Sequence, residues 1–186
     1  MTMRTATRED IDELADLERI CFPEAEAATR ESLARRLAVY PQHFLLLTDA
    51  GRIIGFVNGL ASDLRDLTDE MYERAEMHDA NGRWQMIFGV DVHPDYRRRG
   101  LAEALLRRFI ERAREQDRLG LVLTCKDRLV HYYAKLGFVD EGISASTHGG
   151  VVWHKMRLTF NTSATQSGLE HPGDQPANLV QRIFRR

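Results

Sequence analysis

The run Arg97-Arg98-Arg99-Gly100-Leu101-Ala102 has the chemistry of an anion-binding turn. It lies between an apolar stretch at 84–93 that predicts a strand and an amphipathic stretch at 100–116 that predicts a helix. The first N–H groups of a helix have no intrahelical acceptor, and the helix dipole favours a negative charge beside them. Gly100 allows the backbone to approach a ligand closely, and the guanidinium groups add side-chain donors. The sequence therefore predicts that this turn binds a diphosphate.

The surrounding elements decide between a diphosphate site and a solvated arginine-rich turn. Apolar runs and turn residues predict strands at 4–6, 44–48, 53–60, 84–93, 121–125, 138–143 and 151–158. Helical spacing and capping residues predict helices at 11–21, 29–40, 100–116 and 128–136. The acid-rich stretch 63–79 predicts a helix and loop that either is plainly solvated or attracts a cationic acceptor. The order is that of a mixed α/β domain, in which a strand feeds the arginine turn and a helix follows it.

The arginine turn resembles the acetyl-CoA motif of the GCN5-related N-acetyltransferases (GNAT family). In that motif Gln or Arg, two variable residues, Gly, one variable residue and Gly or Ala follow a strand and open a helix. The preceding Val90-Asp91-Val92-His93-Pro94-Asp95-Tyr96 is also similar to the family, and the order of predicted elements follows it from Thr5 to about Leu158. The resemblance implies the GNAT fold, α/β with a mixed central sheet of about seven strands flanked by about four helices. It also implies acetyl-CoA as the cosubstrate.

A second stretch of sequence resembles one branch of this family in particular. Cys125-Lys126-Asp127-Arg128-Leu129-Val130-His131-Tyr132-Tyr133-Ala134-Lys135-Leu136-Gly137-Phe138 resembles the arylalkylamine (serotonin) N-acetyltransferases, and Tyr133 falls on their catalytic tyrosine. A phenol with a pKa of about 10 is a suitable general acid for a departing thiolate. Tyr132 and Tyr133 lie about 100° apart on a helix, so one can pack in the core while the other faces the cosubstrate. We favour Tyr133 as the acid, with core packing as its alternative role.

The resemblance places the pantetheine arm of acetyl-CoA along Val90-Asp91-Val92. The backbone groups of Val90 and Val92 would pair with that arm, and a bulge here would aim an N–H at the thioester oxygen. The sequence departs from the arylalkylamine enzymes where their two proton-conducting strand histidines correspond to Met86 and Phe88, neither of which accepts a proton. The family's general base is therefore missing.

Three residues are candidates to replace the missing base: His78, Glu76 and His148. Each is titratable, and each lies in a segment next to the predicted acceptor cleft. His148 belongs to the loop 144–150 between the last two strands, which borders the acceptor in the family. Each of the three is also typical of an ordinary surface residue. The other histidines lack the spacing of a metal site, so we expect no metal.

Composition excludes several classes of function. The chain has 186 residues, a net charge of −2 and two cysteines, which we expect to be reduced thiols. It lacks the roughly 20 apolar residues of a membrane span, and its start has no secretory pattern, so we expect a cytoplasmic protein. Arginines of the 100–116 helix alternate with acids, which argues against a nucleic-acid partner. We expect one domain at 1–160 and a flexible polar tail at 161–186 with a short basic amphipathic end.

The leading hypothesis is an acetyl-CoA-dependent N-acetyltransferase acting on a primary amine, either an arylalkylamine or a polyamine-like acceptor. The amine would attack the thioester directly in a ternary complex. Two alternatives stay open: acetylation of a protein or peptide amine, and a non-catalytic acetyl-CoA sensor. The sequence also leaves open whether the protein forms a homodimer.

Overall fold

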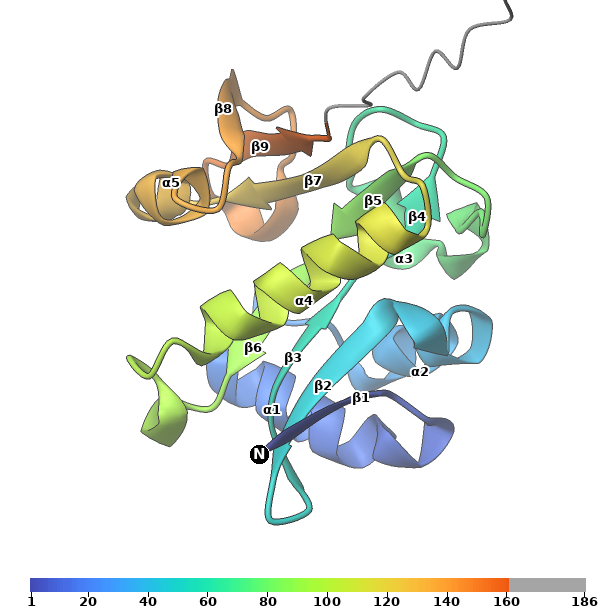
Figure 1. Ribbon diagram of the computed structural model, residues 1–186, viewed down its shortest axis with the longest axis vertical. Helices are drawn as coiled ribbons and strands as arrows, with labels where there is room; N and C mark the ends of the chain where they lie inside the picture. Colours follow the sequence, from blue (N-terminus) through green and yellow to red (C-terminus); the bar gives the residue numbers. More distant parts are fainter. Residues whose placement is uncertain (161–186) are drawn as a thin grey trace, which may run out of the picture.

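Strands and helices alternate along residues 1–160, the part of the chain that the computed structural model describes (Figure 1). The strands are β1 (Thr2–Thr5), β2 (Phe44–Asp49), β3 (Arg52–Asn58), β4 (Ala61–Ser62), β5 (Trp84–Ile87), β6 (Gly89–Val92), β7 (Gly120–Cys125), β8 (Val139–Ile143) and β9 (His154–Thr159). The α-helices are α1 (Ile11–Cys21), α2 (Arg30–Val39), α3 (Glu70–Glu73), α4 (Leu101–Glu115) and α5 (Asp127–Ala134). The tail predicted at 161–186 lies outside the described residues.

The α/β class is confirmed, but the strands form two sheets where a single central sheet was predicted. The first sheet has the order β1-β2-β3-β6 and is antiparallel throughout. The second has the order β4-β5-β7-β9-β8, in which only β5 and β7 run parallel. The described residues contain nine strands, two more than the sequence predicted, because β4 and the division of one long strand were not foreseen. They contain five α-helices, of which α3 lies in the stretch 63–79, where a helix and loop were predicted.

The single strand predicted at 84–93 is wrong as one continuous element. It breaks at Phe88, where β5 ends in the second sheet and β6 begins in the first. The Phe88 N–H donates to the carbonyl of Asn58, the last residue of β3, at 2.8 Å. The chain that runs antiparallel to β6 therefore stays hydrogen-bonded at the break itself. A Cβ at position 59 would lie only 1.8 Å from the Met86 carbonyl oxygen. The backbone at residue 59 can therefore approach β5 this closely because residue 59 is glycine. Both halves of the strand are apolar, and periodicity therefore could not reveal that they belong to different sheets.

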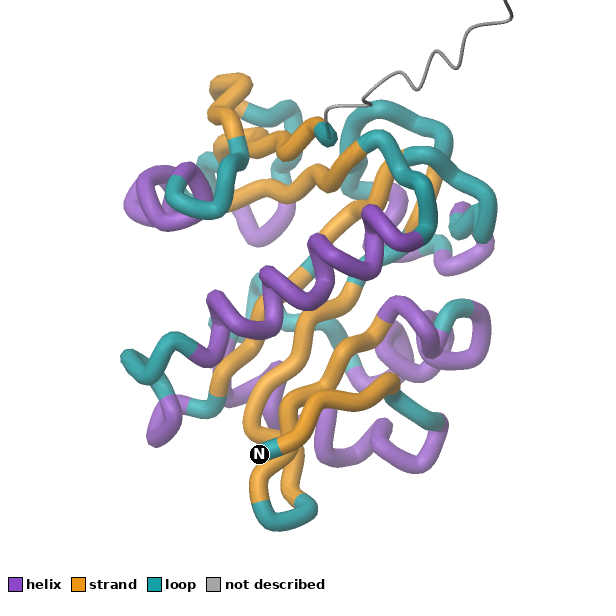
Figure 2. The backbone as a smooth tube through the Cα atoms, in the orientation of Figure 1, coloured by secondary structure: helices purple, strands orange, loops and turns teal. Residues whose placement is uncertain are grey.

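Helices cover both faces of the first sheet, with α4 on one face and α1 and α2 on the other (Figure 2). The alternation of side chains along β2 explains why both faces are buried. Leu45 and Leu47 pack with Leu105 and Phe109 of α4, whereas Phe44 and Leu46 pack with the apolar faces of α1 and α2. The apolar stripe of each helix thus meets the apolar part of β2, which stabilises the layers by burial of nonpolar area.

The outer face of α4 carries arginines and glutamates that pair with each other. Arg107 contacts Glu103 at 2.7 Å, and Arg108 contacts Glu115 at 2.8 Å. This alternation leaves α4 without the uninterrupted basic face that a nucleic acid would require. At 15 residues α4 is the longest helix described, and within residues 1–160 no helix combines the length and the apolar character needed to cross a membrane.

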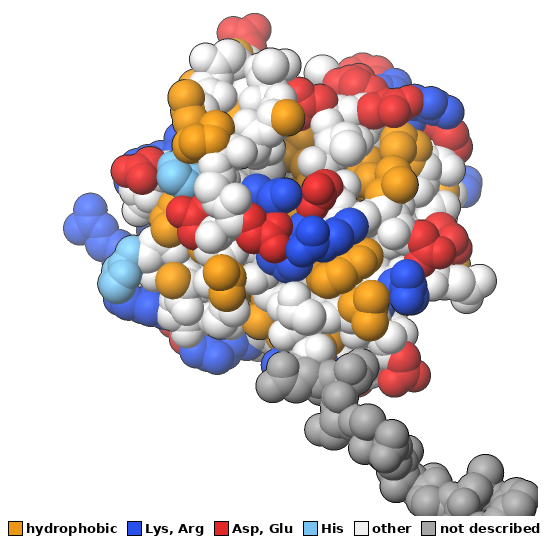
Figure 3. Space-filling model, turned by 90° about the horizontal axis from the view of Figure 1, so that it is seen from above, with side chains coloured by type: hydrophobic (Ala, Val, Ile, Leu, Met, Phe, Trp, Pro, Cys, Tyr) orange, Lys and Arg blue, Asp and Glu red, His pale blue; other side chains and the backbone are white. Residues whose placement is uncertain are grey.

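Ion pairs also tie the acid-rich stretch 63–79 to the rest of the chain. Asp66 contacts Arg157 at 2.5 Å and Lys155 at 3.2 Å. Within the stretch itself, Glu76 contacts Arg74 at 2.9 Å. Viewed from above, acidic and basic side chains lie beside each other on the surface (Figure 3). This pairing weakens the field that the stretch would otherwise offer to a free cation.

Candidate active site

The arginine turn lies at the N-terminus of α4 and borders a hollow of about 180 Å³. Gly100, the N-cap, has φ +74°, a left-handed conformation that glycine adopts without strain. Arg97 is tied back to the turn because its Nε donates to the Val92 carbonyl at 3.0 Å. Arg99 donates to the Asp95 carbonyl at 2.8 Å. The hollow is lined by Val92, Tyr96, Arg97, Arg98, Gly100, Leu101, Ala102, Glu103 and Tyr132.

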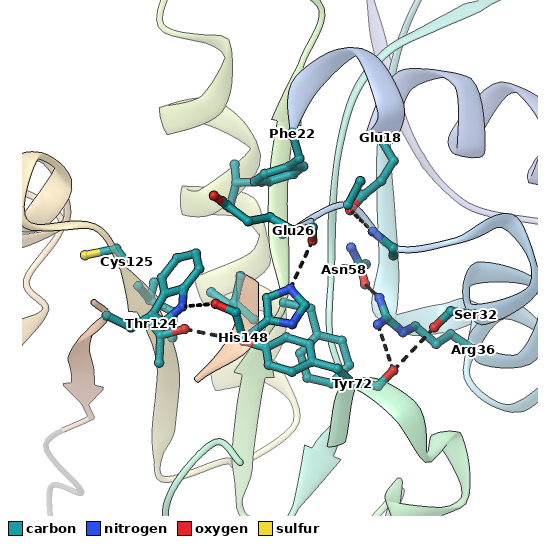
Figure 4. A pocket seen from close by; sticks show the side chains of 18 of the residues that line it. Glu18, Phe22, Glu26, Ser32, Arg36, Asn58, Tyr72, Thr124, Cys125 and His148 are labelled. Atoms are coloured by element: carbon teal, nitrogen blue, oxygen red, sulfur yellow. Dashed lines mark hydrogen bonds between the residues drawn. The ribbon is translucent and has the colours of Figure 1, made fainter. Parts of the chain in front are cut away.

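A second cavity, of about 190 Å³, lies where β6 separates from β7 (Figure 4). As the last strand of its sheet, β6 has one edge without a strand partner among the described residues. The cavity is lined by Glu18, Phe22, Glu26, Ala27, Ala28, Thr29, Ser32, Arg36, Asn58, Tyr72, Glu73, Ile87, Phe88, Gly89, Val90, Leu123, Thr124, Cys125, Leu129, Tyr133, His148 and Trp153. Segments far apart in the sequence therefore meet around one small, partly polar space.

The two adjacent tyrosines of α5 line different spaces. Tyr133 lines the cavity, and Tyr132 lines the hollow at the arginine turn, with its buried Oη lacking a partner among the described residues. The two rings meet edge to face at 5.2 Å between centroids. Burial raises the pKa of Tyr133 above its ordinary value, and Cys125 adds to that shift. The phenol of Tyr133 therefore stays protonated at neutral pH and is available as a proton donor.

His148 reaches the cavity from the loop between β8 and β9, within the short 3₁₀ helix η5 (His148–Gly150). Its Nε2 lies 3.0 Å from the Glu26 carbonyl oxygen. A carbonyl only accepts, so in the neutral ring Nε2 carries the proton and Nδ1 holds the free lone pair. The ring stacks on Tyr72 at 4.9 Å, and the indole N–H of Trp153 donates to the His148 carbonyl at 2.8 Å. These contacts fix the orientation of the imidazole.

The same loop is tied to both sides of the cavity. Asp69 accepts a hydrogen bond from the Thr147 N–H at 2.9 Å and another from the Ser146 hydroxyl. Lys126 forms an ion pair with Glu26 at 2.7 Å, joining the start of α5 to the segment between α1 and α2. The loop, through His148, and Lys126 thus both contact Glu26 in the wall of the cavity.

The other two base candidates lie elsewhere. The His78 ring packs against Tyr40 and His43 at 4.9 and 4.7 Å between centroids, and its Nδ1 accepts from the Ala61 N–H at 3.2 Å. Glu76 is exposed and binds Arg74. Neither residue lines the cavity, so the structure brings only His148 of the three together with Tyr133.

Sequence reasoning missed two buried charged residues of the cavity, Glu18 of α1 and Arg36 of α2. A signal was present in the spacing. Glu18 follows Leu14 by four residues and Leu17 by one, and Arg36 directly precedes Leu37, so both charges occupy positions on the inward faces of their helices. A charge at such a position requires a partner or a polar cavity.

Asp91, predicted to line the pantetheine arm, has its side chain fully buried beside α1. Neither carboxylate oxygen has a hydrogen-bond partner among the described residues. Burial raises the pKa of Asp91 well above the ordinary value, and the nearby Glu18 carboxylate raises it further. Burial therefore favours the neutral, protonated form of Asp91 in the folded protein.

The comparisons with known proteins agree with this architecture. A family model described as "Acetyltransferase (GNAT) family" matches residues 11–138. The chain belongs to this family. GNAT enzymes use acetyl-CoA, and the free N–H groups at the start of α4, the surrounding arginines and the unpaired Tyr132 hydroxyl fit its diphosphate.

The similarities to individual GNAT proteins are distant. The serotonin N-acetyltransferase of Mesocricetus auratus is 26% identical over 165 residues, covering 87% of this chain and 78% of the relative. The loading GNATL domain of CurA from Lyngbya majuscula superposes with a TM-score of 0.74 at 16% identity, covering 85% of this chain and 96% of that domain. The GNAT-like decarboxylase GphF, solved with isobutyryl-CoA, gives a TM-score of 0.73 at 22% identity, covering 86% and 99%. At such identities the structural likeness shows the fold alone.

The Asp91 carboxyl gives a prediction about stability and pH. Its pKa is raised in the folded state, so the unfolded chain releases this proton more readily and the contribution of Asp91 to stability falls as pH rises above about 4. We expect the unfolding free energy of wild type, minus that of Asp91→Asn, to decrease by up to about 1.4 kcal/mol per pH unit between pH 5 and 8. Urea denaturation at several pH values measures it. The exposed Asp16→Asn is the control, and a difference independent of pH would contradict the assignment.

Proposed function

We propose that the protein transfers the acetyl group of acetyl-CoA to a primary amine of a small acceptor by direct attack in a ternary complex. The observation that carries the proposal is the shared cavity of Tyr133 and His148, which neighbours the hollow at the arginine turn. One residue can supply a proton and the other can accept one, which are the two proton transfers that amide formation from an ammonium ion requires.

The N-terminus of α4 is the proposed site for the diphosphate of acetyl-CoA. Free N–H groups of the first helical turn would hold its oxygens, with Arg97, Arg98 and Arg99 adding positive charge. The pantetheine arm would then run along β6, whose outer edge has no strand partner among the described residues. Val92 already accepts from Arg97 through its carbonyl oxygen, so Val90 is the better candidate for pairing with that arm.

His148 and Tyr133 are assigned the proton transfers that activate the amine and release the thiolate. His148 Nδ1 takes a proton from the acceptor ammonium, and the freed nitrogen forms a bond to the acetyl carbon. The carbon–sulfur bond breaks, and the Tyr133 hydroxyl gives its proton to the departing thiolate. The nitrogen still carries the second proton that it must lose to become an amide, and this proton passes through solvent to the Tyr133 phenolate. Protonated His148 releases its own proton to solvent, so one proton is released per turnover.

The cysteines favour direct attack over an acyl-enzyme. Cys125 lines the cavity, but burial raises the pKa of its thiol to about 11. Burial likewise raises the pKa of the Cys21 thiol to about 11. The thiolate is the nucleophilic form of cysteine, and it is scarce at neutral pH for both residues.

The size and closure of the cavity favour a small acceptor over a protein. Its volume of about 190 Å³ suits a small molecule, and the loop at 144–153 covers its outer side through the His148 and Asp69 contacts. A folded protein would need an open groove to present a lysine or its N-terminus. Mass spectrometry of the acetylated products, from a panel of amines and from peptides, separates the two classes.

Binding of coenzyme A is expected to depend on the arginine turn. Coenzyme A at 1 mM should raise the melting temperature of wild type, since a ligand that binds only the folded state stabilises it. Reversing charge in the double variant Arg97→Glu/Arg99→Glu should weaken its affinity by about 10- to 100-fold, measured by calorimetry. The control reverses Arg19 and Arg35, two exposed residues of α1 and α2. Equal affinities in both double variants would exclude the turn as the diphosphate site.

Turnover is expected to depend on the Tyr133 hydroxyl. Tyr133→Phe should lower kcat by about 10²- to 10⁴-fold while leaving the affinity for coenzyme A unchanged, because only the proton donor is lost. Tyr132→Phe, at the neighbouring position, should keep kcat within a few fold. Release of free coenzyme A thiol measures both. Tight coenzyme A binding with only background release of the thiol, unchanged by Tyr133→Phe, would support the sensor alternative instead.

The base is tested by the pH dependence of the rate. His148→Gln should lower kcat/KM by about 10²- to 10⁴-fold near pH 7 and remove the acid-side limb of the profile, because no lone pair remains to take the proton. Glu76→Gln, a change at an exposed residue outside the cavity, should leave the profile intact. If the acid limb persists in His148→Gln, the base is another group.

A further inference from the structure

The guanidinium of Arg36 is buried in the wall of the cavity, and no carboxylate of residues 1–160 forms an ion pair with it. The residue is only 4% exposed. One terminal nitrogen donates to the Tyr72 carbonyl at 2.9 Å and the other to Asn58 Oδ1 at 3.4 Å, while the group lies over the Phe88 ring at 4.7 Å. Its Nε is buried and has no acceptor among residues 1–160.

Such an arrangement is costly unless something compensates for it. A buried cation loses its hydration, and neutral carbonyl groups replace only part of that energy. Burial lowers the pKa of Arg36, yet a guanidinium remains charged at any physiological pH. A group of this kind that lines a cavity is a ready-made site for an anion, and its planar donors match a carboxylate.

A buried carboxylate faces the same cavity from the neighbouring helix. Glu18 is 5% exposed, and its Oε1 accepts from the Ala28 N–H at 2.8 Å. Its Oε2 is buried and receives no hydrogen bond from the described residues. Figure 4 shows Glu18 and Arg36 on the same side of the cavity, facing His148. No ion pair within 4.0 Å joins the two, so in the described part of the chain each keeps unused hydrogen-bonding capacity.

We propose that the acceptor is an amine that also carries a carboxylate, such as a free amino acid. Arg36 binds the carboxylate, and Glu18 attracts the ammonium group before His148 removes its proton. This inference rests on the proposed function and narrows its acceptor. It departs from the arylalkylamine and polyamine acceptors that the sequence predicted, because those carry no carboxylate to satisfy Arg36.

The physical reason for selectivity is the unpaired donor. When an acceptor lacks the carboxylate, Arg36 Nε stays buried and unsatisfied, and the complex forfeits a charge-assisted pair. Sites built to hydrogen-bond a substrate group reject analogues without it far more strongly than sites that only accommodate extra volume. A lysine side chain or the N-terminus of a protein is rejected for the same reason, because neither has a carboxylate next to its amine.

The test uses matched acceptor pairs that differ only in the carboxylate. L-phenylalanine is compared with phenethylamine, L-lysine with cadaverine and L-methionine with 3-methylthiopropylamine, each with acetyl-CoA. Wild type is expected to favour the amino acid in at least one pair by about 100-fold or more in kcat/KM. Arg36→Met should abolish this ratio through KM for the amino acid, with KM for acetyl-CoA unchanged. Arg36→Lys should restore part of it, and the exposed Arg35→Met is the matched control.

A measurement on wild type alone guards against loss of folding in the Arg36 variants. Calorimetry of the protein loaded with coenzyme A compares L-phenylalanine and L-methionine with their carboxamides, which keep the amine and lose the negative charge. Binding of the amino acid at least about 10-fold tighter than that of its amide supports the proposal. Equal binding, or no binding of any amino acid, overturns it.

The outcomes separate this inference from the proposed function. If wild type acetylates the carboxylate-free amines as well as the amino acids, the carboxylate site is wrong and acetyl transfer stands. If no acceptor is acetylated but amino acids bind in a carboxylate-dependent way, the site stands and the proposed transfer fails. The last experiment uses malonyl-CoA, an acyl donor whose acyl group itself carries a carboxylate. If Arg36→Met impairs only the use of this donor, Arg36 binds the carboxylate of the acyl group and not that of the acceptor, and the inference is overturned.

Discussion

The break at Phe88 is the constraint on which the rest of the site depends. On one side of it β5 is paired with β7, and on the other β6 has β3 as its single strand partner within residues 1–160. If the strand had continued in one sheet, backbone hydrogen bonds and side chains would fill the space between β6 and β7. The separation instead leaves an open strand edge, and the cavity of Tyr133 and His148 lies beside it. A glycine at position 59 permits the close approach that the crossing requires.

The cavity contains charges that an apolar core would not tolerate. Glu18 and Arg36 line it, and Asp91, which does not line it, is buried near Glu18. Burial raises the pKa of Glu18, and the Ala28 N–H and the Arg36 cation oppose that shift. Burial also raises the pKa of Asp91 and so favours its neutral form. Two apolar clusters, one under α4 and one under α1 and α2, supply the stability that this polar space does not. Among the described residues, Glu18 and Arg36 thus bring unused hydrogen-bonding atoms to the wall of the cavity.

The parts of the site that depend on local chain geometry could be predicted from sequence. The turn at 97–102 does lie between a strand and the start of a helix, because the apolar run before it and the amphipathic run after it define those elements by themselves. The two tyrosines of α5 do diverge, as helical geometry requires. The division of the strand at 84–93 could not be predicted, since its two halves are equally apolar and only their different partners distinguish them. The same holds for the base candidates, because His78, Glu76 and His148 differ only in where the fold carries them.

The sequence by itself determined the α/β class, the family, the helix N-terminus suited to a diphosphate and the tyrosine that faces the cavity. These follow from periodicity, capping and motif spacing within a few neighbouring turns of chain. Only the tertiary structure decided which histidine lines the same cavity as that tyrosine, and that Arg36 and Glu18 line this cavity without forming an ion pair. Those relations join segments separated by tens to more than a hundred residues, and their distances are set by the packing of helices on two diverging sheets.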